Sequence, residues 1–168
     1  LALLLAYVLS LESIGWWYAL APPGQPWPLA GVALLLTITA AHAFRLRPAA
    51  LPAHILLAAG TATVGAALLA LHWPPGSFPL AIALWNGGLL LIWRYGSHRF
   101  EIWRETLDLW LNLLPVATLA LLFATPGFDW GGGALTLILL GAAALARGIW
   151  QTEQLWLKAG VILLLAGS

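Results

Sequence analysis

Pro-Gly turns and cationic residues alternate along the chain, and this alternation constrains the fold more than any other feature. Three turns recur 52 and 51 residues apart (75 − 23 and 126 − 75), at Pro23-Gly24, Pro75-Gly76 and Pro126-Gly127. Long apolar runs separate these turns from the seven cations, which are Arg45, Arg47, Arg94, Arg99, Arg104, Arg147 and Lys158. A chain with turns at one end of its apolar runs and cations at the other is expected to cross a bilayer as helical hairpins.

The composition also favours a membrane protein. Apolar residues make up 62% of the chain and charged residues 8%, whereas roughly a quarter of a soluble domain is charged. No Lys/Arg-rich tract is suited to a phosphate backbone, so no nucleic-acid partner is expected. The absence of cysteine excludes disulfides, thiolate metal sites and cysteine nucleophiles.

An all-α, polytopic transmembrane fold of about seven helices follows from the apolar runs. We expect helices near Leu1–Ala21, Leu29–Phe44, Ala49–Leu71, Phe78–Trp93, Ile102–Ala124, Gly133–Ala146 and Trp150–Ala166. The second, fourth and sixth runs are shorter than the roughly 20 residues that cross a bilayer. Those helices must therefore stand upright, draw in flanking residues or lie where the bilayer is thin.

Orientation follows from the positive-inside rule, because every connection is short. The cations lie in the connections after the second, fourth and sixth helices, which places the N-terminal side in the cytoplasm and the chain in the plasma (inner) membrane. Tryptophans should mark the two interfaces. Those expected at the outer one are Trp27, Trp73 and Trp130, and those at the inner one are Trp93, Trp103, Trp150 and Trp156.

The chain is interpreted as one transmembrane region of tandem hairpins, 1–47, 48–99 and 100–148, followed by an incomplete unit at 149–168. The sequence has no methionine and both of its ends lie in apolar runs. We therefore expect it to be an internal part of a longer chain.

Glu12 is the most unusual intramembrane residue, since it lies in the middle of the first apolar run beside only Ser10 and Ser13. A carboxylate at that depth is costly unless it is protonated or paired. It is interpreted as a hydrogen-bonding link to a neighbouring helix, with ion, proton or substrate handling as the alternative.

Asn86 is the second intramembrane polar candidate. It precedes Gly87 and Gly88 inside the fourth apolar run, where small residues permit close approach of helices in lipid. We expect close helix packing there, with a broken helix lining a binding site as the alternative. Gly60 and Gly65 indicate close packing of the third helix in the same way.

Histidines offer only a weak cofactor site. His42, His54 and His98 approach the inner interface, but they show no helical metal-ligand spacing and no carboxylate completes a set. We expect no metal and no haem. The serines show no nucleophile motif and the glycines no phosphate-binding loop, so no catalytic residue is assigned and a non-enzymatic role is favoured.

The segment from Arg94 to Asp108 is the most strongly charged part of the chain. Glu101 with Arg104, and Arg104 with Asp108, have the spacing of ion pairs along one helix. The segment is interpreted as a solvated helix start on the cytoplasmic side, with a partner-docking loop as the alternative.

The stretch from Arg45 to Ser168 resembles segments of the very large, many-helix bacterial membrane proteins of unknown function. The likeness lies in runs such as LPAHILLAAG, HWPPGSFPLAIALW and ILLGAAALARGIW. It implies a tandem array of hairpins and transfers no catalytic residue. The sequence thus favours a structural, scaffold or assembly role, with lipid and other transmembrane helices or membrane subunits as partners. A transporter or channel using Glu12, and a haem or metal carrier, are the alternatives.

Overall fold

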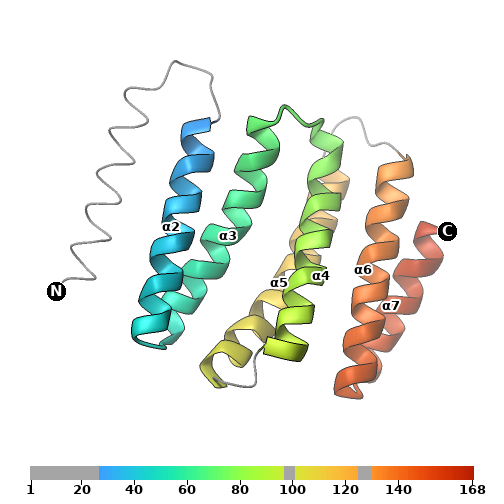
Figure 1. The fold of residues 1–168 in the computed structure, drawn as a ribbon. Coiled ribbons are helices and arrows are strands. Elements are labelled where there is room, and N and C mark those ends of the chain that lie inside the picture. The colour runs from blue at the N-terminus through green and yellow to red at the C-terminus, as the bar shows by residue number, and fades with distance from the viewer. Residues whose placement is uncertain (1–26, 97–100, 125–129) are drawn as a thin grey trace. The chain divides into compact units, whose positions relative to one another are not determined.

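A computed structural model describes residues 27–96, 101–124 and 130–168 (Figure 1). Within these ranges the regular structure is helical and comprises six α-helices and one short 3₁₀ turn. They are α2 (Trp27–Leu46), α3 (Ala50–Ala70), η1 (Pro75–Ser77), α4 (Phe78–Gly96), α5 (Glu101–Ala124), α6 (Trp130–Gln151) and α7 (Gln154–Gly167). The all-α class predicted from sequence is confirmed, and the first predicted helix lies outside the described residues.

Helix boundaries follow the sequence closely for α3 and α5, each of which begins one residue from its predicted start. The second member of each predicted hairpin is longer than its apolar run. α2, α4 and α6 have 20, 19 and 22 residues, because they extend through flanking Trp, Arg, Tyr and Gln residues. Drawing in flanking residues was one of the three ways to span a bilayer with a short apolar run.

Four of the described helices, α2, α3, α5 and α6, are long and apolar enough to cross a membrane. α4 contains Asn86, two glycines and Arg94, and is not one of them. α7 is apolar but has only 14 residues, a length of about 21 Å at 1.5 Å per residue against about 30 Å of hydrocarbon.

The chain divides into two compact units, which are described separately. Unit 1 contains α2, α3 and the start of α5 as far as Thr106. α2 and α3 pack along their length through buried small residues, among them Ala33, Ala40, Ala53 and Ala66. Alanine allows the two backbones to approach closely, which is the usual basis of helix association in lipid.

Two polar contacts complete the α2–α3 pair. The hydroxyls of Thr37 and Thr63 lie 3.1 Å apart across the helices, and each is also 2.7 Å from the carbonyl four residues before it. At the end of α2, Phe44 packs against Trp103 of α5 with ring centroids 5.2 Å apart.

α3 ends at a residue in the left-handed conformation, His72, with φ 55°. The N–H of His72 donates to Leu69 and that of Trp73 to Leu68, at 3.1 and 3.0 Å. These two bonds form a Schellman motif, which satisfies the last carbonyls of the helix. The motif turns the chain toward η1 without a glycine at the left-handed position.

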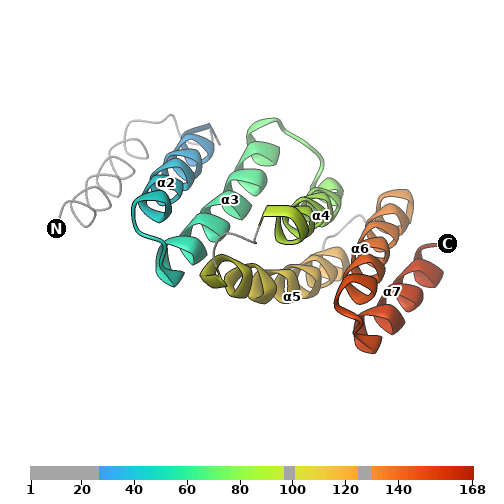
Figure 2. The ribbon, with the colours of Figure 1, turned by 60° about the horizontal axis from the view of Figure 1, so that its bottom comes forward.

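Unit 2 contains η1, α4, α5 from Leu107 onward, α6 and α7. α4 lies beside α6 and runs in the same direction, whereas α6 and α7 form an antiparallel hairpin (Figures 1 and 2). The hairpin turns at Thr152, which has φ 57°, and the N–H of Glu153 donates to Gly148 at 3.1 Å.

Glycines set the spacing between α6 and α7. Gly141, Gly148, Gly160 and Gly167 all lie at the contact, and a Cβ on any of them would come within 3.0 Å of an atom of the other helix. On Gly160 it would lie 2.8 Å from the backbone nitrogen of Leu145 and 2.9 Å from the carbonyl of Gly141. Both contacts are to backbone, so only glycine allows this approach.

The close packing predicted at Gly65, Gly87 and Gly88 is wrong for the part of the chain that the structure describes. Apart from its chain neighbours and the nearby backbone of its own helix, no described atom lies within 4 Å of a Cβ placed on any of these three glycines. α4 is also continuous through Asn86, so the broken-helix alternative is wrong. The sequence shows which glycines lie inside helices. It does not show which face of each helix contacts a neighbouring helix.

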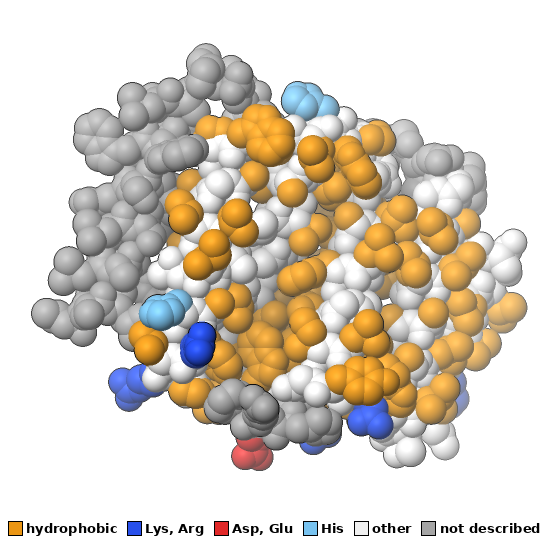
Figure 3. Space-filling view, viewed as in Figure 1, with side chains coloured by type: hydrophobic (Ala, Val, Ile, Leu, Met, Phe, Trp, Pro, Cys, Tyr) orange, Lys and Arg blue, Asp and Glu red, His pale blue; other side chains and the backbone are white. Residues whose placement is uncertain are grey.

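Apolar side chains cover much of the face of the described residues seen in Figure 3. Large ones are exposed along the helices and not only at their ends, for example Leu35 and Ile38 on α2, Val116 and Phe123 on α5 and Leu165 on α7. Phe123 is 81% exposed and Leu165 71%. Blue Lys and Arg side chains in Figure 3 lie near the helix ends.

Candidate polar site at Arg147

The most strongly buried charge in the described residues is Arg147, which is 6% exposed. It lies in the last two turns of α6, four residues before the helix ends at Gln151. The sequence had placed Arg147 in a cytoplasmic connection beyond a helix ending at Ala146. The structure corrects this, because α6 continues for five further residues and turns Arg147 into unit 2.

Three side chains accept hydrogen bonds from the guanidinium of Arg147. Its Nε donates to Gln151 Oε1 at 2.8 Å, its Nη1 to Asn112 Oδ1 at 3.0 Å and its Nη2 to Asp108 Oδ1 at 3.3 Å. Gln151 Nε2 also donates to Asp108 Oδ1, at 3.2 Å. These bonds link α5 and α6 and surround the cation with oxygen atoms.

Local helix geometry explains why these groups meet. Asp108 and Asn112 are four residues apart on α5, and Arg147 and Gln151 are four residues apart on α6, so each pair shares one face of its helix. Two matching faces then bring four polar side chains together. Arg104 also has the helical spacing to pair with Asp108. The Asp108 carboxylate already has a cationic partner without it.

The charge of Arg147 is balanced within unit 2. Its ion pair with Asp108 measures 3.3 Å, and the Asp108 side chain is 34% exposed. Trp156 of α7 adds a cation–π contact, with the guanidinium carbon 4.4 Å from the ring centroid. A buried cation is tolerated where it is paired and hydrogen-bonded, and this one meets both conditions.

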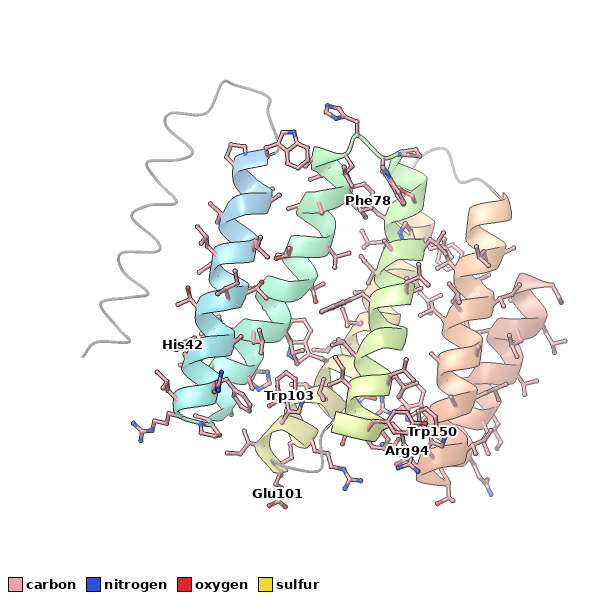
Figure 4. The ribbon with its side chains drawn as sticks, in the orientation of Figure 1. His42, Phe78, Arg94, Glu101, Trp103 and Trp150 are labelled. Atoms are coloured by element: carbon pink, nitrogen blue, oxygen red, sulfur yellow. The ribbon has the colours of Figure 1, made fainter. Side chains whose placement is uncertain are left out.

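A second cation at the same end of unit 2 lies against aromatic rings. The Arg94 guanidinium carbon is 5.8 Å from the ring centroid of Trp150, and Tyr95 meets Trp150 edge-on at 6.5 Å (Figure 4). Arg94 itself is exposed. The C-terminal ends of α4 and α6 therefore share one charged and aromatic surface.

A partly open cavity adjoins Arg147. The centre of a water molecule can occupy a volume of about 30 Å³ within this cavity. The lining of the cavity is mostly apolar. Its polar side chains come from Asn86 of α4 and Arg147 of α6, and Trp156 also lines it. Leu111 and Pro115 contribute the wall from α5.

The candidate residues predicted from sequence have different outcomes. Asn86 lies at this cavity and is 3% exposed. Glu12 and His98 lie outside the described residues. His42 is exposed on α2 (Figure 4). His54 is half-buried in the first turns of α3. Within the described ranges, no three His, Cys, Asp or Glu residues are placed to share a metal ion.

Sequence reasoning missed the role of Arg147. Of the tryptophans expected at the two interfaces, Trp93 is 6% exposed and Trp156 stacks on Arg147. Trp27 and Trp73 are 56% and 52% exposed, at the start of α2 and shortly after the end of α3. The signal for the site was the repeated four-residue spacing, Asp108 to Asn112 and Arg147 to Gln151.

Comparison with protein-family models, with curated proteins and with solved structures found no match to the chain.

Proposed function

We propose that this chain is part of an integral membrane protein of the plasma (inner) membrane, in which its helices serve a non-catalytic scaffold or assembly role. Its partners are lipid and other transmembrane helices or membrane subunits. The observation that carries this proposal is the distribution of apolar side chains, because they are exposed along helices of membrane-spanning length.

Such exposure is unfavourable in water but suits a bilayer. Soluble monomers rarely expose contiguous apolar patches of more than a few hundred Å². Here Leu34, Leu35 and Ile38 are each about half exposed or more on α2. On α5 Val116 is 66% exposed and Phe123 81%.

The polar site supports a structural role. Arg147 has its charge balanced by Asp108 and donates from three of its nitrogens to side chains of its own unit. A cation held in this way links α5 to α6 and α7, since polar contacts between helices substitute in lipid for the missing hydrophobic force.

The proposed orientation places the ends of α2, α4 and α6 in the cytoplasm. Arg45 lies in the last turn of α2 and Arg47 follows it, and Arg94 lies in the last turn of α4. Although Arg147 is buried, Lys158 is exposed one turn into α7. The remaining cations therefore still have the predicted asymmetry when Arg147 is left out.

Reporter fusions test the orientation. Reporters fused after Gly24, Gly76 and Gly127 are expected to lie outside the membrane. Reporters fused after Arg47, Ser97 and Thr152 are expected to lie on the cytoplasmic side. Thr152 is chosen because it occupies the exposed turn between α6 and α7, whereas Gly148 is packed against Leu157. An outside signal at Ser97 would contradict the proposed topology.

Photocrosslinking tests the environment of the exposed face. A photoreactive residue at Phe123 in native membranes should label lipid or a neighbouring membrane protein, because this side chain is 81% exposed. The control is Leu140, 1% exposed in the same unit, which should label only its own chain. Labelling of neither lipid nor another protein from position 123 would refute the proposal.

A further inference from the structure

The cavity of unit 2 contains a buried acceptor without a hydrogen bond. The side-chain oxygen of Asn86 has no hydrogen-bond partner among the described residues, although Asn86 is only 3% exposed. An unsatisfied buried oxygen carries the full desolvation penalty of the group. Native structures usually satisfy such atoms with protein groups or ordered water.

α5 supplies a second acceptor at the same cavity. Pro115 has no backbone N–H, so the carbonyl of Leu111, four residues earlier, receives no helical hydrogen bond from position 115. Leu111 and Pro115 both line the cavity. The proline therefore leaves the Leu111 carbonyl without its usual donor four residues later, at a residue that lines the cavity.

Arg147 supplies the donors. A guanidinium has five N–H groups, and the hydrogen bonds of Arg147 to Gln151, Asn112 and Asp108 use one from each nitrogen. One N–H therefore remains on each terminal nitrogen. The site combines two acceptors and a donor with an otherwise apolar wall.

We propose that this cavity is a binding site for a hydroxyl group, which donates to the side-chain oxygen of Asn86 and accepts from Arg147. The volume of about 30 Å³ decides the size of the polar group that the cavity encloses. One water needs about 10–15 Å³ on this measure, so the enclosed space holds about two or three non-hydrogen atoms. A polar group larger than a hydroxyl with its adjoining carbon does not fit.

The hydroxyl can come from water or from an alcohol dissolved in the membrane. Water has two hydrogens and can serve both Asn86 and the Leu111 carbonyl. A long-chain alcohol can serve only one acceptor, and its alkyl chain would leave through the open side of the cavity along the apolar lining. This site is separate from the proposed scaffold role and does not depend on the orientation of the chain in the membrane.

The test is nuclear Overhauser contact between the leucine methyl groups and the bound molecule, in protein reconstituted into lipid bicelles. Leu111 lines the cavity, whereas Leu107, one turn earlier on α5 and 0% exposed, does not. Contact with water at Leu111 but not at Leu107 is the expected result for a water site. With added 1-decanol, contact between Leu111 and the methylene beside the hydroxyl identifies the alcohol as occupant.

The variant Asn86→Leu completes the test, because it removes the acceptor and fills the cavity. It should abolish the contact at Leu111 and leave the spectrum of Leu107 unchanged. Absence of both water and decanol contacts at Leu111 in the wild-type protein overturns the proposal, whatever the variant does. A wild-type contact that persists unchanged in a folded Asn86→Leu protein also overturns it.

Discussion

Replacing Gly160 with alanine should separate α6 from α7. The added Cβ would lie 2.8 Å from the backbone nitrogen of Leu145 and 2.9 Å from the carbonyl of Gly141, whereas ordinary contacts of a Cβ begin at 3.4 Å. Backbone atoms cannot rotate away as a side chain end can. The helices must therefore move apart locally by about 0.6 Å (3.4 − 2.8).

Two opposing effects set the magnitude. Alanine favours a helix over glycine by about 0.8–1.0 kcal/mol. Inserting an extra methyl group into a tightly packed contact costs about 1–3 kcal/mol, partly because a gap of about 0.5–1 Å loses a quarter to a half of the dispersion energy across the interface. Gly160→Ala should therefore lower the free energy of unfolding by up to about 2 kcal/mol.

Gly87→Ala is the matched control. It makes the same chemical change inside α4 of the same unit, where no described atom lies within 4 Å of the new Cβ. Because alanine has the higher helix propensity, this variant should raise the free energy of unfolding by up to about 1 kcal/mol. The free energies of unfolding of the two variants should thus differ by about 1–3 kcal/mol. Gly87→Ala should be more stable than the wild type, and Gly160→Ala less stable.

Both variants can be compared by denaturant unfolding in detergent micelles, followed by circular dichroism. The reasoning fails if Gly160→Ala stabilises the protein as much as Gly87→Ala does. A second check is Gly141→Ala, whose Cβ would meet the Gly160 carbonyl at 3.0 Å. Because both changes separate the same helices, the double variant should lose less stability than the sum of the two single losses.

Three further predictions address the turn, the ion pair and the alternative function. Thr152→Gly should stabilise the protein by about 0.5–1 kcal/mol in the same unfolding assay, because a β-branched residue is strained at φ 57°; a loss of stability would contradict this. Arg147→Lys should cost about 1–3 kcal/mol, since an ammonium cannot reproduce the forked hydrogen bonds, and a double-mutant cycle with Asp108→Asn should show a coupling energy of about 1 kcal/mol. If the chain instead couples transport to Glu12, a folded Glu12→Gln protein in vesicles should lose proton- or ion-dependent flux, and unchanged flux would exclude that role.

Much of the helical layout could be predicted because its signals are local. α3 and α5 begin within one residue of the predicted positions, and Pro79 lies in the first turn of α4, where its missing N–H costs nothing. The helix C-termini were less accurate. α6 continues five residues past the predicted end, because buried partners stabilise Arg147 and Gln151 inside the helix.

The candidate site could be predicted only in part. Asn86 was identified from its own chemistry, as a polar residue in an apolar run, and it does line the cavity. Arg147 was assigned to a connection because charge alone favours a solvated position, and its partners lie 35 and 39 residues away in sequence. Only the folded arrangement of α5 and α6 brings these side chains within hydrogen-bonding distance.

The sequence by itself determined that the described part of this chain forms apolar helices, with a Pro-Gly turn before α4 and cations in the last turns of α2 and α4. Those properties depend on hydropathy and on the conformational limits of proline and glycine, which act within a few residues. The tertiary structure decided which glycines lie at a helix contact. Gly87 and Gly160 are both helical glycines in apolar surroundings, yet only Gly160 faces another backbone. The rotation of each helix about its axis sets this difference, and that rotation depends on all the contacts of the folded unit.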